Sequence, residues 1–576
     1  EIWTRFIRGG RSPDPRLTFA LTVTSPDGWQ AVSQGQRQVT DGAQRWTEDH
    51  PQQDIYLVAA PFRRTGRDHD GITLATYLRG DEPALARRYL DAAGPYLDMY
   101  QRLIGDYPYR KFALVENFWD SGYGMPSFTL MGPRIIRFPF IIYTSFPHEI
   151  LHNWWGNGVY VDYAGGNWSE GLTAYLSDHL LRAQRGEATA YRRTTLQQYA
   201  DFAANGRDFP LTRFQARHSS ASQAVGYGKT LMFFHMLRRR LGDAAFSDGL
   251  RRLYRDNRFR QAGFDDVRQA FEVAGDTDLG QFFNQWVTRT GAPALTLEEA
   301  RMAPGDGRNE LVITLRQRQP GPAYALDVPL ALTLEGQQQA AVKTVAMGGK
   351  RQTFRLPLAK APLSVAVDPA FDLFRRLDPS EIPPALSQLF GAERPWYVLP
   401  AAAPEARRKA YRRLIAQWGR SGADTRVVRD DELEALPEGG SVWLLGWDNR
   451  FRGRLGQALS GHPAAVTKDY VELEDRRWSR GQAQVVITAS NPNGTGTLGW
   501  IAAEPAALPG LARKLPHYSK YSYLVFRGEA PDNVLKGQWR VTDSTMSRPV
   551  VQIDGQTLRV PSAALPPRAP LIRLKP

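Results

Sequence analysis

Cysteine is absent from this chain of 576 residues. Disulfide bonds and thiolate metal sites are therefore excluded, which fits either the cytoplasm or an exported protein that avoids thiol chemistry. The sequence also lacks any run of about eighteen apolar residues, so it contains no predicted membrane-spanning helix. Histidine is scarce, with nine residues, and a histidine spacing typical of a metal site is informative for that reason.

Acidic residues are fewer than basic ones, 59 against 73, and the formal net charge is +14. Such a charge favours anionic surfaces or acidic substrates. Arginine is nevertheless spread along the whole chain, as in Arg238-Arg239-Arg240 on a predicted amphipathic helix, and no nucleic-acid-binding motif is present. We therefore expect no nucleic-acid partner.

The most informative stretch is His148-Glu-Ile-Leu-His152. Residues four apart lie on the same face of a helix, so both imidazoles point at one metal ion, and Glu149 reaches a water bound to it. Glu170 comes eighteen positions after His152 and begins an apolar-periodic run that predicts a second helix. Two histidines, a glutamate ligand and a carboxylate base are typical of a catalytic zinc site with one position left for water.

The segment from His148 to Tyr175 resembles the aminopeptidase N family of gluzincin zinc metallopeptidases, which have a thermolysin-like catalytic domain. The family pattern is H-E-x-x-H-x-W-x-G-N and then W-x-x-E-G; this chain has H-E-I-L-H-N-W-W-G-N and then W-S-E-G. The resemblance implies a peptide or protein substrate and a single Zn2+. By position it implies the ligands His148, His152 and Glu170 and the general base Glu149.

The linker before Glu170 departs from this family. Seventeen residues separate His152 from Glu170, where the family usually has eighteen. Ala164-Gly165-Gly166 can absorb a one-residue deletion because glycine tolerates unusual backbone angles. No nearer carboxylate is a better ligand candidate, since Asp162 falls before the second helix and Asp178 lies two turns beyond Glu170.

Two further family motifs are matched to different degrees. Tyr227 aligns with the tyrosine that, in the family, donates a hydrogen bond to the oxyanion of the tetrahedral intermediate. The substrate-binding edge strand of the family carries G-A-M-E-N, whose glutamate binds the free amine of the substrate. An ungapped alignment from Phe112 matches that motif to Tyr123, Gly124, Met125, Pro126 and Ser127 of this chain. Proline offers neither a charge nor a backbone donor, so the usual amine anchor is missing.

The remaining pattern predicts a multidomain α+β protein. Strand-like alternation opens the chain, helical periodicity surrounds the histidine motif, alternating strands return after Leu295, and strands alternate with helices from Trp396 onward. The last alternation predicts a parallel sheet with helices on its faces. We predict a truncated β-rich N-terminal domain at 1–70, a thermolysin-like, mostly α catalytic domain at 71–295, a β-sandwich at 296–395, an α/β domain at 396–545 and a β-hairpin tail at 546–576.

These features predict a zinc metallopeptidase that does not require a free amino terminus in the usual way. Two alternatives stay open. One is an ordinary aminopeptidase whose amine anchor is relocated to Glu116, to Asp120 or to an acid of the C-terminal half. The other is a catalytically silent zinc-bearing binding protein.

The cellular location is predicted from the first residue and the composition of the chain. It begins at Glu1 rather than Met, and it contains no cysteine. We expect an exported bacterial protein, periplasmic or associated with the envelope, with its leader removed. A cytoplasmic protein is the alternative.

Overall fold

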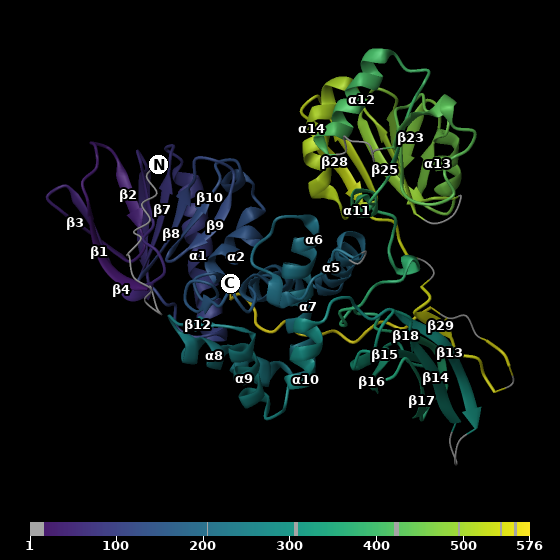
Figure 1. Cartoon of the computed structure of the whole chain (residues 1–576), viewed down its shortest axis with the longest axis horizontal. Helices are drawn as coiled ribbons and strands as arrows, with labels where there is room; N and C mark the ends of the chain where they lie inside the picture. The colour runs from purple at the N-terminus through teal and green to yellow at the C-terminus, as the bar shows by residue number, and fades with distance from the viewer. Residues whose placement is uncertain are drawn as a thin grey trace.

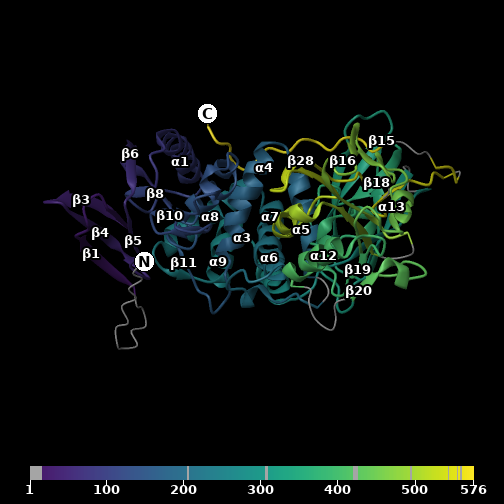
Figure 2. The same cartoon turned by 90° about the horizontal axis from the view of Figure 1, so that it is seen from above.

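The computed structural model describes residues 16–575, apart from 204–205, 305–308, 420–425, 493–495, 542–543, 554 and 558–560. The chain is multidomain and combines helices with several sheets, as predicted (Figure 1). Seen from above, the N-terminal strands lie at one end, the sandwich and the α/β unit at the other, and the helical region between them (Figure 2). Within the described residues, no helix has both the length and the apolar character that crossing a bilayer requires.

The N-terminal strands form two small sheets, β1-β4-β3 and β2-β5. The predicted boundary at residue 70 is wrong, because it cuts a hairpin. β6 pairs antiparallel with β7 across Asp70 and Gly71, both of which have positive φ, as a tight hairpin turn requires. The strand bounds are β1 (Leu17–Val23), β2 (Gln30–Ser33), β3 (Gln36–Thr40), β4 (Ala43–Gln52), β5 (Leu57–Ala60), β6 (Arg63–His69) and β7 (Ile72–Leu78).

The next sheet has the order β6-β7-β8-β10-β9 and ends on an exposed edge strand, β9. β8 (Lys111–Glu116) is buried throughout and parallel to β10 (Phe128–Met131), whereas β9 (Gly122–Met125) is antiparallel to β10. Helix α1 (Pro83–Leu103) buries an apolar face that includes Leu85, Tyr89 and Tyr96. Tyr89 and Tyr96 on α1 donate hydrogen bonds of 2.8 Å to Ile136 O and Ile142 O, so α1 holds the segment that enters the histidine helix.

Helices dominate the middle of the chain. Buried tryptophans at 154, 155 and 168 fill the space between them. Three of the described helical runs contain π-helical turns, a feature often found at functional sites. The bounds are α2 (Ser145–Leu151), α3 (Ser169–Ala174), π-turn η3 (Tyr175–His179), α4 (Leu180–Gln184), α5 (Ala188–Phe202), α6 (Ser220–Gln223), π-turn η5 (Ala224–Lys229), α7 (Thr230–Leu241), α8 (Asp243–Asn257), α9 (Phe264–Gly275), α10 (Gly280–Phe283) and π-turn η6 (Asn284–Thr288), with short strands β11 (Tyr160–Val161) and β12 (Gln261–Ala262).

A sandwich of two sheets follows, β13-β14-β17 and β16-β15-β18-β29. Its inward residues, such as Leu311 and Val328, belong to the same continuous apolar core as the helical region. The two regions therefore pack as one body. The bounds are β13 (Leu295–Pro304), β14 (Asn309–Gln317), β15 (Leu326–Leu334), β16 (Ala341–Met347), β17 (Arg351–Pro357), β18 (Pro362–Val367) and β29 (Ser547–Pro549).

The α/β unit contains a sheet in the order β20-β19-β21-β26-β25-β27-β28. The predicted parallel sheet is only half correct. The first strands are parallel, but β25, β27 and β28 are antiparallel to their neighbours. Antiparallel neighbours can be joined by a short turn, as between β27 and β28, whereas parallel ones need a crossover such as α12. The bounds are β19 (Trp396–Leu399), α12 (Glu405–Gln417), β20 (Arg426–Arg429), β21 (Val442–Leu445), α13 (Arg452–Ala458), β22 (Ala464–Val466), β23 (Tyr470–Leu473), β24 (Arg476–Ser479), β25 (Gln484–Ser490), β26 (Thr497–Ala502), α14 (Leu508–Lys514), β27 (Tyr523–Arg527) and β28 (Asp532–Gly537).

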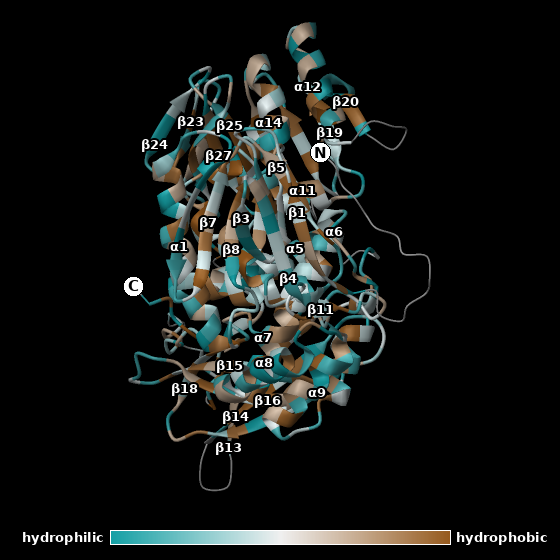
Figure 3. Cartoon of the chain, turned by 90° about the vertical axis from the view of Figure 1, so that its left-hand side faces the viewer, coloured by the Kyte–Doolittle hydropathy of each residue, from teal (hydrophilic) through white to brown (hydrophobic). Residues whose placement is uncertain are grey.

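Apolar clusters cover both faces of this sheet. One packs against α12, α14 and the short helix α11 (Leu386–Gly391), and the other against α13 and the small sheet β22-β23-β24. Strands β25 and β27 are hydrophobic along most of their length (Figure 3). Because α11 packs on this unit, the predicted sandwich boundary at 395 lies too late in the chain.

The predicted β-hairpin tail at 546–576 falls partly outside the described residues. β29 extends the sandwich beside β18, and the chain then returns to the helical region, where Gln184 Nε2 donates to Ile572 O at 2.9 Å. One antiparallel bridge joins Val551 and Thr557. Residues 558–560 of the predicted second hairpin strand lie outside the described residues.

Candidate metal centre

Helix α2 presents the histidine motif. His148 and Glu149 lie within it, and His152 is its C-terminal cap residue. Phe146, Ile150 and Leu151 are buried against α1 and its neighbours, which fixes the rotation of the helix. His148 and His152 consequently share one face, and their ring centroids are 4.9 Å apart.

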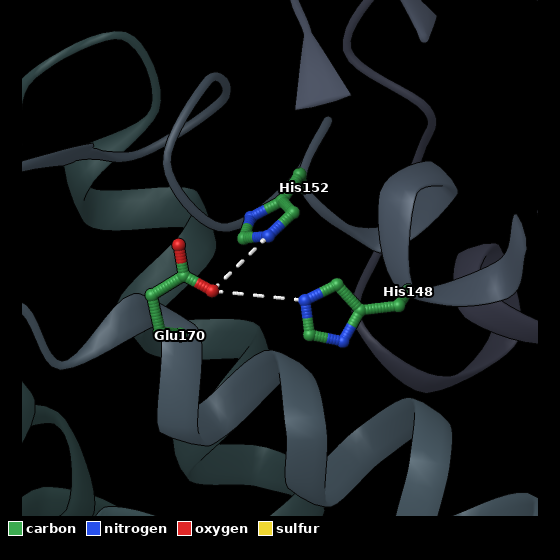
Figure 4. Close-up of side chains that lie close together, drawn as sticks. All are labelled: His148, His152 and Glu170. Carbon is green, nitrogen blue, oxygen red and sulfur yellow. Dashed lines mark ion pairs between the residues drawn. The ribbon is translucent and has the colours of Figure 1, made fainter. Parts of the chain in front are cut away.

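Glu170 on α3 faces this pair (Figure 4). Its Oε2 atom lies 3.6 Å from His148 Nε2 and 3.5 Å from His152 Nε2. One ligand atom from each of the three side chains lies within 4.8 Å of the others. The structure thus brings together the three residues that the sequence predicts as metal ligands.

The outer nitrogen of each imidazole has its own hydrogen bond. His152 Nδ1 lies 2.9 Å from Trp155 O, and a carbonyl can only accept, so Nδ1 carries the proton. His148 Nδ1 lies 3.0 Å from Asp178 Oδ2 on the π-turn η3. Both arrangements leave Nε2 facing Glu170, and each Nε2 can bind a metal ion once it gives up its proton.

The start of α3 sets the position of Glu170. Asn167 Oδ1 accepts hydrogen bonds from Ser169 N at 3.1 Å, from Ser169 Oγ at 2.8 Å and from Glu170 N at 3.4 Å. Gly166, in the segment where we placed the one-residue deletion, has φ +101°, and a Cβ there would lie 2.3 Å from Leu211 O. Only glycine allows this close approach, and the shortened linker still delivers Glu170 to the histidines.

The cluster favours positive charge. Burial alone would lower the pKa of His148, but the hydrogen bond to Asp178 and the nearby carboxylate of Glu170 outweigh it and hold that pKa well above its usual range. Burial likewise opposes ionisation of Glu170, and the neighbouring His152 and His148 still bring its pKa well below normal. The acids therefore stabilise positive charge at the point where these side chains converge.

The donor set fits a zinc ion. Glu170 Oε2 is buried and has no hydrogen-bond partner, although such atoms are nearly always paired. Two imidazole nitrogens and one carboxylate oxygen make up the three-ligand set of catalytic zinc sites. A cation bound by these atoms would satisfy the otherwise unpaired oxygen.

Glu149 lies between this cluster and the edge strand β9. A Cβ on Gly122 would lie 3.1 Å from Glu149 Oε1, and one on Gly124 would lie 3.1 Å from Oε2 and 2.7 Å from His152 Cβ. The strand approaches the carboxylate closely because both positions lack a side chain. Burial raises the pKa of Glu149, which suits a group that must take up a proton.

Tyr227 lies on the π-turn η5, opposite α2. Its ring is stacked against that of His148, with centroids 6.5 Å apart and planes at 16°. Burial, followed by the charge of Glu170, raises the pKa of its hydroxyl, which therefore stays protonated and able to donate.

A cavity of about 460 Å³, which we call the zinc cleft, opens beside His148, Glu149 and Tyr227. It is lined by His148, Glu149, Asp178 and Tyr227 and by parts of β9, α5 and the loop before α6. The sequence of residues 142–286 matches the peptidase family M1 domain. This region belongs to peptidase family M1.

Curated relatives agree with this assignment. The chain is 22% identical to the alanine/arginine aminopeptidase of Saccharomyces cerevisiae, over 50% of this chain and 37% of that protein. It is 24% identical to aminopeptidase RNPEPL1 of Homo sapiens, over 53% and 45%, and 22% identical to aminopeptidase N of Lactobacillus helveticus, over 49% and 37%. The matches thus span less than half the length of these relatives.

The four residues predicted for substrate binding, which precede the matched M1 segment, have different environments. Gly124 and Met125 end the edge strand and are partly exposed, whereas Pro126 and Ser127 form the buried turn into β10. Lys111 Nζ donates to Ser127 Oγ at 2.5 Å, and Ser127 N donates to Asn153 Oδ1 at 2.8 Å. The Ser127 side chain therefore holds the turn from inside rather than facing the cleft.

The two acids considered as replacement anchors are both paired with arginines. Glu116 is buried, lies 2.8 Å from Arg137 NH1 and accepts from Arg79 N at 2.7 Å. Asp120 accepts from Arg134 Nε at 2.5 Å and from Arg134 N at 3.2 Å. Each carboxylate is thus already neutralised by a neighbour.

Sequence reasoning missed three residues of this site. Asp178 follows Glu170 by eight positions, a spacing that keeps both on nearly the same helix face, and this signal could have identified it. Asn167 organises α3, and Arg217 lines the zinc cleft from the loop before α6. No local pattern distinguishes Asn167 or Arg217 from ordinary loop residues.

Proposed function

We propose that this chain is a zinc-dependent peptidase that hydrolyses peptide bonds without requiring a free amino terminus in the usual way. The observation that carries the proposal is the convergence of His148, His152 and Glu170 on one point, with Glu170 Oε2 buried and without a hydrogen-bond partner. The match of residues 142–286 to the M1 domain supports the same chemistry.

His148, His152 and Glu170 would hold the ion. A zinc ion supplies Lewis acidity, which makes an attacking water more acidic and polarises the scissile carbonyl. Glu149 removes the proton of the attacking water at its carboxylate, and its raised pKa favours that uptake. The same carboxyl then returns the proton to the nitrogen of the departing amine.

The remaining groups orient the substrate. Tyr227 keeps its hydroxyl proton and donates a hydrogen bond to the oxygen that becomes negative in the transition state. The outer edge of β9 has no strand neighbour within the described sheet, so an extended substrate can pair with it as an added strand. A chain held in this way can continue past the cleft in both directions.

Glu149→Gln tests the catalytic part of the proposal. The variant should bind one zinc ion per chain, measured by elemental analysis, while turnover of a quenched-fluorescence peptide library falls by roughly 100- to 10,000-fold. A chelator-treated sample of the unaltered protein controls for contaminating peptidases. Turnover equal to that of the unaltered protein would refute the role of Glu149.

An ordinary aminopeptidase is the second candidate, favoured by the names of the relatives, which are aminopeptidases. Its anchor would have to be Glu116, Asp120 or an acid of the C-terminal half. A peptide series with free and acetylated amino termini separates the two proposals. Internal cleavage of acetylated peptides supports the first, and stepwise removal of residues from free termini only supports the second.

A further inference from the structure

The zinc cleft offers no free carboxylate for a substrate ammonium group among the described residues that line it. Its acids are Glu149, which faces the glycines of β9, and Asp178, which accepts from His148. The nearby acids Glu116 and Asp120 are paired with Arg137 and Arg134. An aminopeptidase needs a negative group at this place, because burying an unpaired ammonium is costly.

The cleft does contain an arginine. Arg217 lines it together with Tyr227, Gln223 and Gln198. In the part of the chain that the structure describes, no hydrogen bond or ion pair of the Arg217 side chain is found, and the residue is exposed. Burial raises the pKa of Tyr227, and the charge of Arg217 opposes that rise, which places the guanidinium within electrostatic reach of the Tyr227 hydroxyl.

The backbone on both sides of Arg217 is fixed. Asn167 Nδ2 donates to Gln215 O at 2.9 Å, and Asn167 N donates to Phe214 O at 2.7 Å. After Arg217, Ser219 and Ser222 form a capping box at the start of α6. Since Asn167 also organises the start of α3, one residue sets the positions of both Glu170 and the Arg217 loop.

We propose that Arg217 binds a carboxylate of the substrate and that the peptidase prefers peptides with an acidic group close to the scissile bond. This inference rests on the proposed function. A guanidinium binds a carboxylate through two parallel hydrogen bonds, which suits Arg217 better than a point charge would. The carboxylate comes either from an Asp or Glu side chain or from the carboxyl terminus of a short peptide.

Matched peptide pairs distinguish these sources. The first set is acetylated and amidated and carries Glu or Gln at successive positions around the cleaved bond. The second set has no acidic side chain and ends in a free carboxylate or an amide. We expect the acidic member of one set to exceed its neutral partner by roughly 10- to 100-fold in kcat/KM, the range for a charged hydrogen bond.

Three variants locate the effect. Arg217→Ala should reduce the ratio of kcat/KM for acidic over neutral peptides to about one. Arg217→Lys should retain part of this preference, because the charge remains while the bidentate hydrogen-bond geometry is lost. Arg213→Ala is the matched control, an exposed arginine of the same segment that does not line the cleft, and should keep the ratio of the unaltered protein. Zinc content is measured for each variant.

The outcomes separate this inference from the proposed function. If neutral peptides are cleaved and acidic ones are not preferred, or if the preference survives in Arg217→Ala, the role of Arg217 is refuted while the peptidase stands. If the zinc-loaded protein cleaves nothing, the proposed function fails. In that case, the role of Arg217 is tested by measuring the binding affinity of fluorescently labelled versions of the same peptide pairs. Equal affinity for the acidic and the neutral peptide of a pair overturns the inference.

Discussion

Two histidine pairs lie in the same helical region and have opposite environments. His148 and His152 meet Glu170, whereas His235 meets Asp372 and its neighbour His179 meets Arg192; the ring centroids of His179 and His235 are 5.5 Å apart. In the first pair the acid retains a buried oxygen without a hydrogen bond. In the second, His235 Nε2 lies 2.9 Å from Asp372 Oδ1.

Arginine accounts for the difference. Arg192 lies 2.8 Å from His179 Nε2 and 3.2 Å from Asp372 Oδ1, and Arg568 from the returning tail donates to Asp372 Oδ2 at 2.5 Å. Burial, followed by the charge of Arg192, lowers the pKa of His235 to about 3, while the pKa of His148 is raised. The ligand atoms of His148, His152 and Glu170 thus converge with no guanidinium between them, whereas Arg192 contacts both His179 and Asp372 in the second group.

The largest effect that tests this comparison is expected from Glu170→Gln. Removing a ligand should weaken zinc binding by more than the roughly 100-fold typical of an outer hydrogen-bond partner. Competition with a chromophoric chelator measures the affinity, and circular dichroism checks the fold. Retention of tight zinc binding would contradict the ligand assignment.

Asp372→Ala should affect stability and leave the metal site intact. It removes the acid that neutralises Arg192 and Arg568, and breaking such a buried pair costs about 3–5 kcal/mol. Urea unfolding measures the loss, and the folded variant should still bind one zinc ion. Two results would remove the distinction between the two clusters. One is a free energy of unfolding equal to that of the unaltered protein, and the other is loss of zinc binding by a variant that is still folded.

Asp178→Asn should produce a smaller loss of zinc affinity at the cluster of His148, His152 and Glu170. The amide can still contact His148 Nδ1 but no longer raises the basicity of the ring. We expect zinc affinity to fall by about 10- to 100-fold, with thermal stability of the zinc-free protein nearly unchanged. Asp98→Asn, at another His–Asp pair, is the control and should not alter zinc affinity.

The smallest effect concerns Asp201, near the contact between α5 and α11, whose carboxylate has a buried oxygen and forms no ion pair with an arginine among the described residues. Burial raises its pKa to about 7. Because the folded pKa exceeds the unfolded one of about 4, stability is full below about pH 4 and declines as pH rises through about 7.

Asp201→Asn should abolish this part of the pH dependence. We expect a difference on the order of 1 kcal/mol between pH 5 and pH 8, since local opening at the contact limits the loss. Thermal unfolding of both proteins at the two pH values measures it. Parallel pH profiles would show that Asp201 does not titrate in this range.

Short-range regularities were sufficient to predict much of the molecule. The period of an α-helix placed His148 and His152 on one face, and the alternation after Leu295 predicted the sandwich strands, because both patterns depend only on residues near in sequence. The general multidomain architecture and the peptidase family followed from the same local motifs. Pro126 in the place of the family glutamate was also visible from the sequence alone.

Contacts between distant residues were decided only by the tertiary structure. Trp155 O and Asp178 direct the two imidazoles, Asn167 joins α3 to the Arg217 loop, and β25 to β28 run antiparallel although the sequence alternates strand and helix. Whether the carboxylate of an acid such as Glu116 forms an ion pair with an arginine depends on which side chains the fold places beside it. The sequence determined which side chains were available for chemistry, and packing determined which of them remained unpaired, since pairing is a property of neighbours in space.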